Sequence, residues 1–95
     1  MSAEPFDWII TSISGAGSLS NGDGHQWVFR KKGDGWEVEG ARGQTASVQA
    51  GGNGLVRISG FPGNWNANGD YAFSRESDGC ALKSMHSRHR LIWKC

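Results

Sequence analysis

This sequence has little cysteine, little proline and almost no net charge. Two Cys, two Pro and a formal net charge of +1 are spread over 95 residues. No run of residues approaches the roughly 20 apolar residues that a membrane-spanning helix requires. A chain so close to neutrality also has no long-range field to attract nucleic acid or an acidic membrane. We therefore expect no membrane association, and any electrostatic partner must meet a local patch of charge.

The motifs of catalysis and metal binding are missing as well. The sequence has no Gly-x-Ser-x-Gly, His-Glu-x-x-His or Cys-x-x-Cys motif and no glycine-rich phosphate loop. His86 and His89 are spaced like metal ligands, but residues three apart on a strand face opposite sides and no third ligand is evident nearby. Acidic residues beside glycine, such as Asp34 and Asp78, are typical of turns. The sequence predicts no enzyme, no metal site and no cofactor.

The two cysteines, Cys80 and Cys95, are compatible with two compartments. A bond between them would close a loop of about 15 residues and contribute about 3 kcal/mol in the chain-entropy description. A cytosolic protein would instead keep both as thiols. The N-terminal stretch MSAEPFDWII lacks the basic and apolar regions of a secretion signal. We expect a cytosolic protein, or a secreted one if the numbering begins after processing.

Glycine and aromatic residues are abundant. The chain has 15 Gly, five Trp, four Phe and one Tyr. Many glycines with few prolines indicate tight turns rather than a disordered tail, and the aromatics supply large apolar surfaces for a core. At this length we expect one domain covering residues 1–95, because separate cores usually appear only above about 250 residues.

One phrase occurs twice in the chain. VFRKKGDGWEVEG and AFSRESDGCALKS share a Phe, four residues and an Asp-Gly pair, followed by an alternating run. Ile-Ser-Gly and Asn-Gly also recur in the same order, which predicts an internal duplication of halves covering approximately 8–50 and 54–95. Asp-Gly is typical of hairpin turns, so Gly35 and Gly79 are expected at positive φ.

Alternating and β-branched or aromatic residues predict eight strands and no helix. The expected strands are 8–13, 25–31, 35–39, 44–49, 55–59, 70–75, 80–84 and 89–94. The fold class is therefore all-β: a small eight-stranded antiparallel barrel or sandwich built from two similar four-stranded halves.

The stretch GFPGNWNANGDY, residues 60–71, is the first candidate for a binding site. Two aromatic residues lie in it among turn-forming residues. A sugar ring stacks on an aromatic face while planar amides and carboxylates bind its hydroxyl groups. The alternative is that Trp65 is an apolar lid over one end of the barrel. The candidate ligand-binding residues are Phe61, Asn64, Trp65, Asn66, Asn68, Asp70 and Tyr71.

The matching stretch of the first half, residues 15–27, has a similar polar composition. It contains Asn21, Asp23, His25 and Gln26, but Leu19 stands near the place of Trp65. The two stretches would therefore not be equal sites, and a single functional site is compatible with duplication.

The second candidate is the basic stretch KSMHSRHRLIWK, residues 83–94. Basic residues interleaved with aromatics can follow a phosphate backbone and stack bases, whereas a solvated strand face explains the same charges without a ligand. The leading hypothesis is a small carbohydrate-binding, lectin-like module with a glycan as its partner. The alternative is a protein-interaction, protease-inhibitor or toxin-like module. The third choice is single-stranded nucleic-acid binding through the C-terminal basic strand, which would be lost on changing Arg88 and Arg90.

Overall fold

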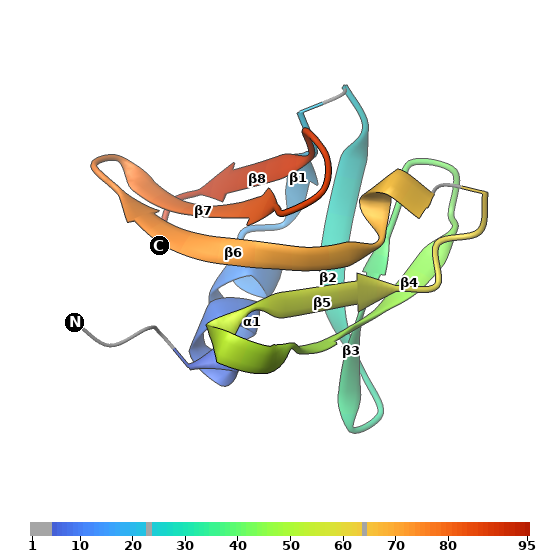
Figure 1. The fold of residues 1–95 in the computed structure, drawn as a ribbon, viewed down its shortest axis with the longest axis horizontal. Coiled ribbons are helices and arrows are strands. Elements are labelled where there is room, and N and C mark those ends of the chain that lie inside the picture. Colours follow the sequence, from blue (N-terminus) through green and yellow to red (C-terminus); the bar gives the residue numbers. More distant parts are fainter. Residues whose placement is uncertain (1–4, 23, 64) are drawn as a thin grey trace.

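The computed structural model describes residues 5–22, 24–63 and 65–95, except for the side chain of Trp65. Eight antiparallel strands follow one another in a single sheet in the order of the sequence (Figure 1). The sheet curls into a nearly closed barrel, which confirms the expected small all-β barrel. The elements are α1 (Phe6–Gly15), β1 (Ser18–Ser20), β2 (Gln26–Lys32), β3 (Gly35–Glu39), β4 (Thr45–Ala50), η1 (Gly52–Gly54), β5 (Val56–Ser59), η2 (Trp65–Ala67), β6 (Gly69–Glu76), β7 (Gly79–Ser84) and β8 (Arg90–Trp93).

The first and last strands meet and bring the barrel close to closure. Asn21 directly follows β1, and its carbonyl oxygen accepts a hydrogen bond of 3.0 Å from the backbone N–H of Arg90 at the start of β8. Side chains alternate between the two faces of every strand. The inward face of β2 to β8, one face of α1 and two residues of the β5–β6 connection form a common core. Its residues are Ile9, Ile10, Ile13, Trp27, Phe29, Val38, Ala46, Val48, Val56, Ile58, Phe61, Ala67, Tyr71, Cys80, Leu82, Leu91 and Trp93.

The expected strand at 8–13 is wrong, because this segment lies within α1, the one α-helix among the described residues. Phe6, Ile9, Ile10 and Ile13 have the i, i+3, i+4, i+7 spacing of a helix with one apolar face. Ile9, Ile10 and Ile13 are buried in the core. The β-branched residues of this segment favour a strand by propensity, but burying the apolar helix face prevails over that preference. Among the described residues, no helix is long and apolar enough to cross a membrane.

The repeated phrase forms two hairpins, β2–β3 and β6–β7. The expectation for Gly35 is wrong: the positive φ of the first turn, 58°, belongs to Gly33, and Gly35 begins β3 opposite Lys32. Gly79 has a φ of 154° and begins β7. Of the recurring tripeptides, residues 13–15 end the helix, whereas Ile58 and Ser59 end β5. The duplication of halves stays a prediction.

Cys80 and Cys95 are joined by a disulfide, with their Cα atoms 5.8 Å apart. Cys80 is buried at the start of β7 and Cys95 is the exposed last residue. The bond ties the chain end that follows β8 to the core.

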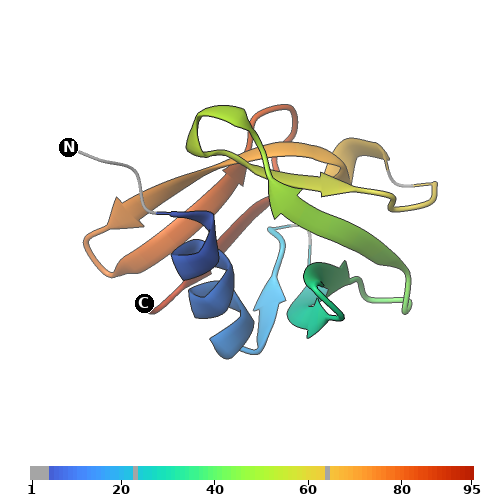
Figure 2. The same ribbon diagram turned by 90° about the horizontal axis from the view of Figure 1, so that it is seen from below.

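Successive connections of this up-and-down sheet lie alternately at its two ends. One end, here called the helix end, carries α1, the disulfide and the connections 33–34, 51–55 and 77–78. Figure 2 shows α1 in front of the strands, between the β6–β7 hairpin and β1. The other end, here called the loop end, gathers the connections 21–25, 40–44, 60–68 and 85–89.

Candidate ligand-binding site

The structure buries two of the seven residues that the sequence proposes for a site. The Phe61 ring packs against Trp27, with ring centroids 5.2 Å apart. Tyr71 is fully buried and its hydroxyl donates a hydrogen bond of 2.6 Å to the Ala67 carbonyl. Burial raises the pKa of Tyr71 well above its ordinary range. Both rings belong to the core, so neither presents a face to a ligand.

Two further candidates shape the loop between β5 and β6. The Asn68 amide accepts a hydrogen bond from the Phe61 N–H at 2.9 Å and donates one to the Phe61 carbonyl at 3.2 Å, which closes the loop. The Asp70 carboxylate pairs with the Arg57 guanidinium, whose Nε lies 2.9 Å away. The hydrogen bond from Arg57 lowers the pKa of Asp70 and outweighs the opposing desolvation.

Among the remaining candidates, Asn66 is exposed in η2. Asn64 and the side chain of Trp65 lie outside the described residues. The stacking role expected for Trp65 stays a prediction.

Three connections of the loop end enclose a pocket of about 360 Å³. The loop between β5 and β6 belongs to the first candidate stretch of the sequence, residues 60–71, and the loop between β1 and β2 belongs to its counterpart in the first half, residues 15–27. The β3–β4 connection completes the rim. The pocket is lined by Asn21, His25, Trp27, Ala41, Arg42, Gln44, Pro62 and Gly63.

Trp27 forms an immobile floor for this pocket. It is 2 % exposed and is the residue of β2 nearest the loops that points inward. Its ring packs against Phe61 and against His89, at centroid distances of 5.2 and 5.6 Å. Tyr71 adds an edge contact at 6.5 Å. The Trp27 ring is held from three sides, so it closes the bottom of the pocket and gives the pocket a fixed shape.

The polar groups of the rim are held by their own loops. In the β3–β4 connection, the Gln44 Oε1 accepts a hydrogen bond of 2.8 Å from the Arg42 backbone N–H. Gly40 lies directly beneath this amide, and a Cβ there would stand 3.2 Å from the Gln44 side chain. In the β1–β2 loop, the Asn21 N–H donates to the His25 carbonyl at 2.9 Å. The amide of Gln44 is thus positioned before any ligand arrives.

A second hollow, of about 410 Å³, extends from the β2–β3 hairpin across β3 and β4 to the end of β5. Its walls include Trp36, Glu37, Ser47 and Ser59. The Glu37 carboxylate is already bound by Arg30 at 3.1 Å and by Lys32 at 3.5 Å. Its charge is therefore neutralised within the protein, and this hollow is the weaker candidate.

Sequence reasoning missed the contribution of the β3–β4 connection, which supplies Arg42 and Gln44. A usable signal was present: in a sheet whose strands pair in sequence order, every second connection lies at the same end. The β3–β4 connection, GARGQ at residues 40–44, therefore lies at the same end of the sheet as residues 21–25 and 60–68.

Within the part of the chain that the structure describes, no three His, Cys, Asp or Glu residues gather as a metal site would require. Comparisons with models of known protein families, with curated proteins and with solved structures find no match to this chain.

Proposed function

We propose that this protein is a small binding module without enzymatic activity, and that it binds carbohydrate in the loop-end pocket. The observation that carries the proposal is the convergence of planar polar groups from two loops, His25, Arg42 and Gln44, around a pocket whose walls also include the apolar side chains of Ala41 and Pro62. Sugar hydroxyl groups are recognised by donors and acceptors of fixed geometry next to an apolar surface.

The size and position of the pocket support this function. Its volume of about 360 Å³ falls in the range of roughly 300 to 1,000 Å³ that small-ligand sites occupy. It lies at the mouth of a barrel, where the strands hold the loops in place, and its floor and β3–β4 rim are restrained by the contacts given above. A preformed site loses little free energy to ordering on binding.

The chemistry of the lining favours binding over hydrolysis. Glycoside hydrolysis uses a pair of carboxyl groups that flank the scissile bond. Among the described lining residues there is no carboxylate, and none is a serine, threonine or cysteine. We therefore propose that the pocket binds its ligand and does not cleave it.

A glycan array probed with the purified, oxidised protein tests the proposal, followed by calorimetric titration of each hit. Gln44→Ala should weaken binding by about fivefold, since it removes about 1 kcal/mol of hydrogen bonding. Gln49→Ala is the matched control, because Gln49 is an exposed glutamine on β4 outside the pocket. Trp65→Ala belongs in the same series, since the sequence predicts that its ring stacks on the sugar.

Two results would count against the site. Equal affinities of Gln44→Ala and Gln49→Ala for a glycan would place binding elsewhere on the molecule. Failure of the folded protein to bind any glycan on the array would overturn the carbohydrate assignment, and a pull-down for a protein partner would then follow.

A further inference from the structure

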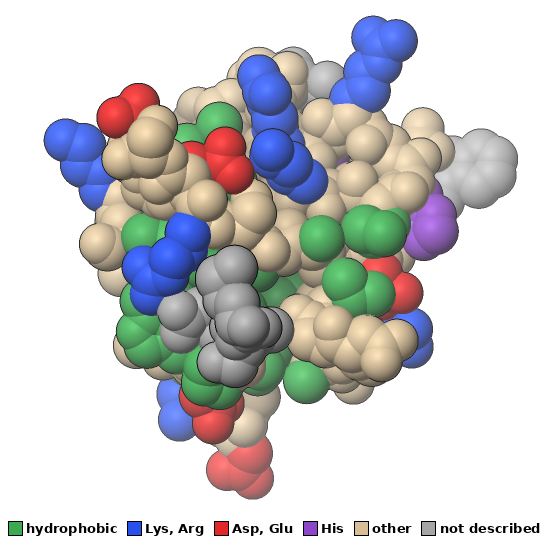
Figure 3. Space-filling view, turned by 60° about the vertical axis from the view of Figure 1, so that its left-hand side comes forward, with side chains coloured by type: hydrophobic (Ala, Val, Ile, Leu, Met, Phe, Trp, Pro, Cys, Tyr) green, Lys and Arg blue, Asp and Glu red, His purple; other side chains and the backbone are tan. Residues whose placement is uncertain are grey.

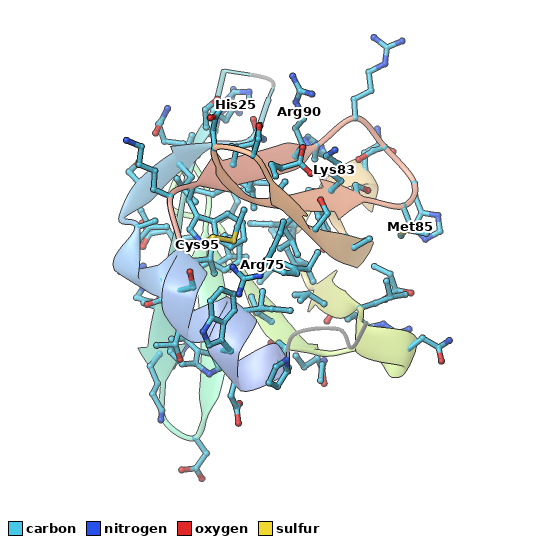
Figure 4. All side chains as sticks on the ribbon, turned by 90° about the vertical axis from the view of Figure 1, so that its left-hand side faces the viewer. His25, Arg75, Lys83, Met85, Arg90 and Cys95 are labelled. Carbon is cyan, nitrogen blue, oxygen red and sulfur yellow. A yellow bond between two sulfur atoms is a disulfide. The ribbon has the colours of Figure 1, made fainter. Side chains whose placement is uncertain are left out.

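The β1–β2 loop borders the pocket on one side and a basic strand surface on the other. Asn21 and His25 line the pocket. On its other side, the loop packs against β8: a Cβ on Gly22 would stand 3.6 Å from the Arg90 Cγ, and the Arg90 N–H bonds to the Asn21 carbonyl. Figure 4 shows His25, Arg90 and Lys83 following one another along the upper side of the molecule.

Two cations face each other directly on the outer surface of β7 and β8. Lys83 and Arg90 are partners in the register of these strands. Like charges at directly opposed positions of an antiparallel pair are destabilising. Arg88 adds a third exposed cation in the turn between the two strands. On the face seen in Figure 3, several Lys and Arg side chains lie in the upper half, with Asp and Glu side chains beside some of them.

Among the described residues, these cations have few acidic partners. Within residues 5–22, 24–63 and 65–95, no carboxylate forms an ion pair with Arg42, Arg88 or Arg90. Lys83 has a single described partner, Glu76, at the limiting distance of 4.0 Å. By contrast, Arg30 on the outer face of β2 is bound by both Glu37 and Glu39. The charges of β7 and β8 are therefore available to an anion.

The nearby aromatic residues do not suit a single-stranded nucleic acid. Such ligands bind by stacking successive bases on exposed rings. Trp93 and Trp27 are buried, and no aromatic side chain that the structure describes is in the exposed class. The residues that flank Lys83 and Arg90 across the strands and along the outer face are Ala72, Ala81 and Ile92. The surface offers charge without stacking.

We infer that the ligand of the loop-end pocket is an acidic polysaccharide, a glycan chain bearing carboxylate or sulfate groups. One residue would occupy the pocket beside Arg42, and the chain would continue across the β1–β2 loop onto Lys83 and Arg90. Its anionic groups would relieve the repulsion between these two cations. This inference rests on the proposed function, because it extends the same site.

Oligosaccharides matched in backbone but not in charge test the inference. Oligogalacturonides are compared with their methyl esters, and heparin fragments with their desulfated forms, each as a short and a long chain. We expect the charged forms to bind more tightly, the long chains most of all, with affinity that falls as salt rises. The carboxylate and sulfate series distinguish the two anionic groups.

The double variant Lys83→Gln/Arg90→Gln should weaken binding of the long acidic chain by about tenfold or more and leave the short chain nearly unaffected. Arg42→Gln should weaken both. Lys31→Gln/Lys32→Gln removes the same charge from the hairpin tip at the helix end, and it should bind like the unmodified protein.

Three outcomes would overturn the inference. Equal affinity for neutral and acidic chains, unaffected by Lys83→Gln/Arg90→Gln, would leave a lectin without charge selectivity, so the proposed function would survive. Equal binding of a single-stranded oligonucleotide would make the surface a general anion site. Absence of binding to all glycans would remove the proposed function together with the inference.

Discussion

The two ends of this barrel differ in how their side chains are used. At the helix end, Ile9, Ile10 and Ile13 of α1 enter the core, and the Trp93 indole donates a hydrogen bond of 2.7 Å to Ser12. The Cys80–Cys95 disulfide lies at the same end. At the loop end, exposed polar groups such as His25 and Arg42 surround a pocket. If the proposed function is correct, stability and binding depend on opposite ends of the barrel and can be changed separately.

The Arg75 side chain illustrates the character of the helix end. Its guanidinium carbon lies 4.8 Å from the centre of the Trp8 ring, and this ring meets Phe73 edge-on at 5.9 Å. A cation over an aromatic face is stabilising. Here the cation serves packing, whereas Lys83 and Arg90 oppose each other on the open face of β7 and β8.

The largest effect is expected from Ile10→Ala in α1. Ile10 is 1 % exposed, and truncating a buried isoleucine costs about 2 to 5 kcal/mol through lost burial and a residual cavity. Urea denaturation measures the loss, and Thr11→Ala, at an exposed helix position, is the control. Any glycan affinity should be retained below the unfolding transition. A loss under 1 kcal/mol would contradict the packing of the helix described above.

Reduction of the disulfide is expected to cost about 3 kcal/mol, because it frees a loop of 15 residues in the unfolded chain. The protein is unfolded in urea with and without a phosphine reductant. The Cys80→Ala/Cys95→Ala variant should lose stability in both conditions and show no response to the reductant. An unchanged midpoint on reduction would show that the bond contributes nothing to stability.

The two hairpin glycines provide a matched pair at the helix end. A Cβ on Gly79 would overlap the backbone carbonyl oxygen of Trp93, whereas the nearest atom to a Cβ on Gly35 is the Lys32 carbonyl oxygen at 3.9 Å. Gly79→Ala should therefore cost about 1 to 3 kcal/mol through the shift that it forces, and Gly35→Ala much less. Thermal unfolding of the two variants measures both losses of stability. Equal losses would contradict the distinction between the hairpins.

Alkaline pH should destabilise the protein through Tyr71. Its pKa in the folded state is raised by burial, so the stability that the neutral phenol maintains is complete below about pH 10 and is lost as the pH rises toward the folded-state pKa. Because Tyr71 is the only tyrosine, phenolate absorbance reports on it alone. The phenolate absorbance should appear over the same pH range in which the protein unfolds.

Tyr71→Phe is the control for this titration. It should lose about 1 kcal/mol with the hydrogen bond to Ala67 and no longer respond to pH above 10 through this group. Half-ionisation of Tyr71 near pH 10 in a protein whose circular dichroism is unchanged would disprove its burial.

The smallest effects on stability are expected at the loop end. Arg42→Gln should change the free energy of unfolding by no more than about 0.5 kcal/mol, as exposed substitutions usually do. Arg90→Gln should raise stability slightly, because it removes the repulsion from Lys83. Urea midpoints at low and high salt measure both. A clear loss of stability in Arg90→Gln would show that this cation serves the fold.

Much of the barrel was predictable because its strands alternate along the sequence. Trp27 and Phe29 in β2, and Leu91 and Trp93 in β8, point to one side by spacing alone, and all four are buried. The first segment failed because Ile9, Ile10 and Ile13 are strong strand formers in isolation. Their period of three to four residues, after Pro5 and with Asp7 in the first turn, was the better indicator.

The candidate site was only partly predictable. The polar loop composition pointed to the end of the barrel that carries the proposed pocket. However, Phe61 and Tyr71 are buried in the core, and the Asn68 amide forms hydrogen bonds within its own loop. Composition cannot distinguish a ring that stacks on a ligand from one that stacks on Trp27. Arg42 and Gln44 come from a connection with no unusual composition, and only its place in the sheet reveals them.

By itself, the sequence determined the mainly β character of the chain, most of its strands and the core residues that those strands contribute, because side-chain alternation is a local property. The tertiary structure decided three things: that residues 6–15 are helical, that the two cysteines meet, and that three separate connections form one pocket next to opposed cations on β7 and β8. Each of these depends on contacts between residues far apart in the chain, which closure of the barrel creates and local preference does not encode.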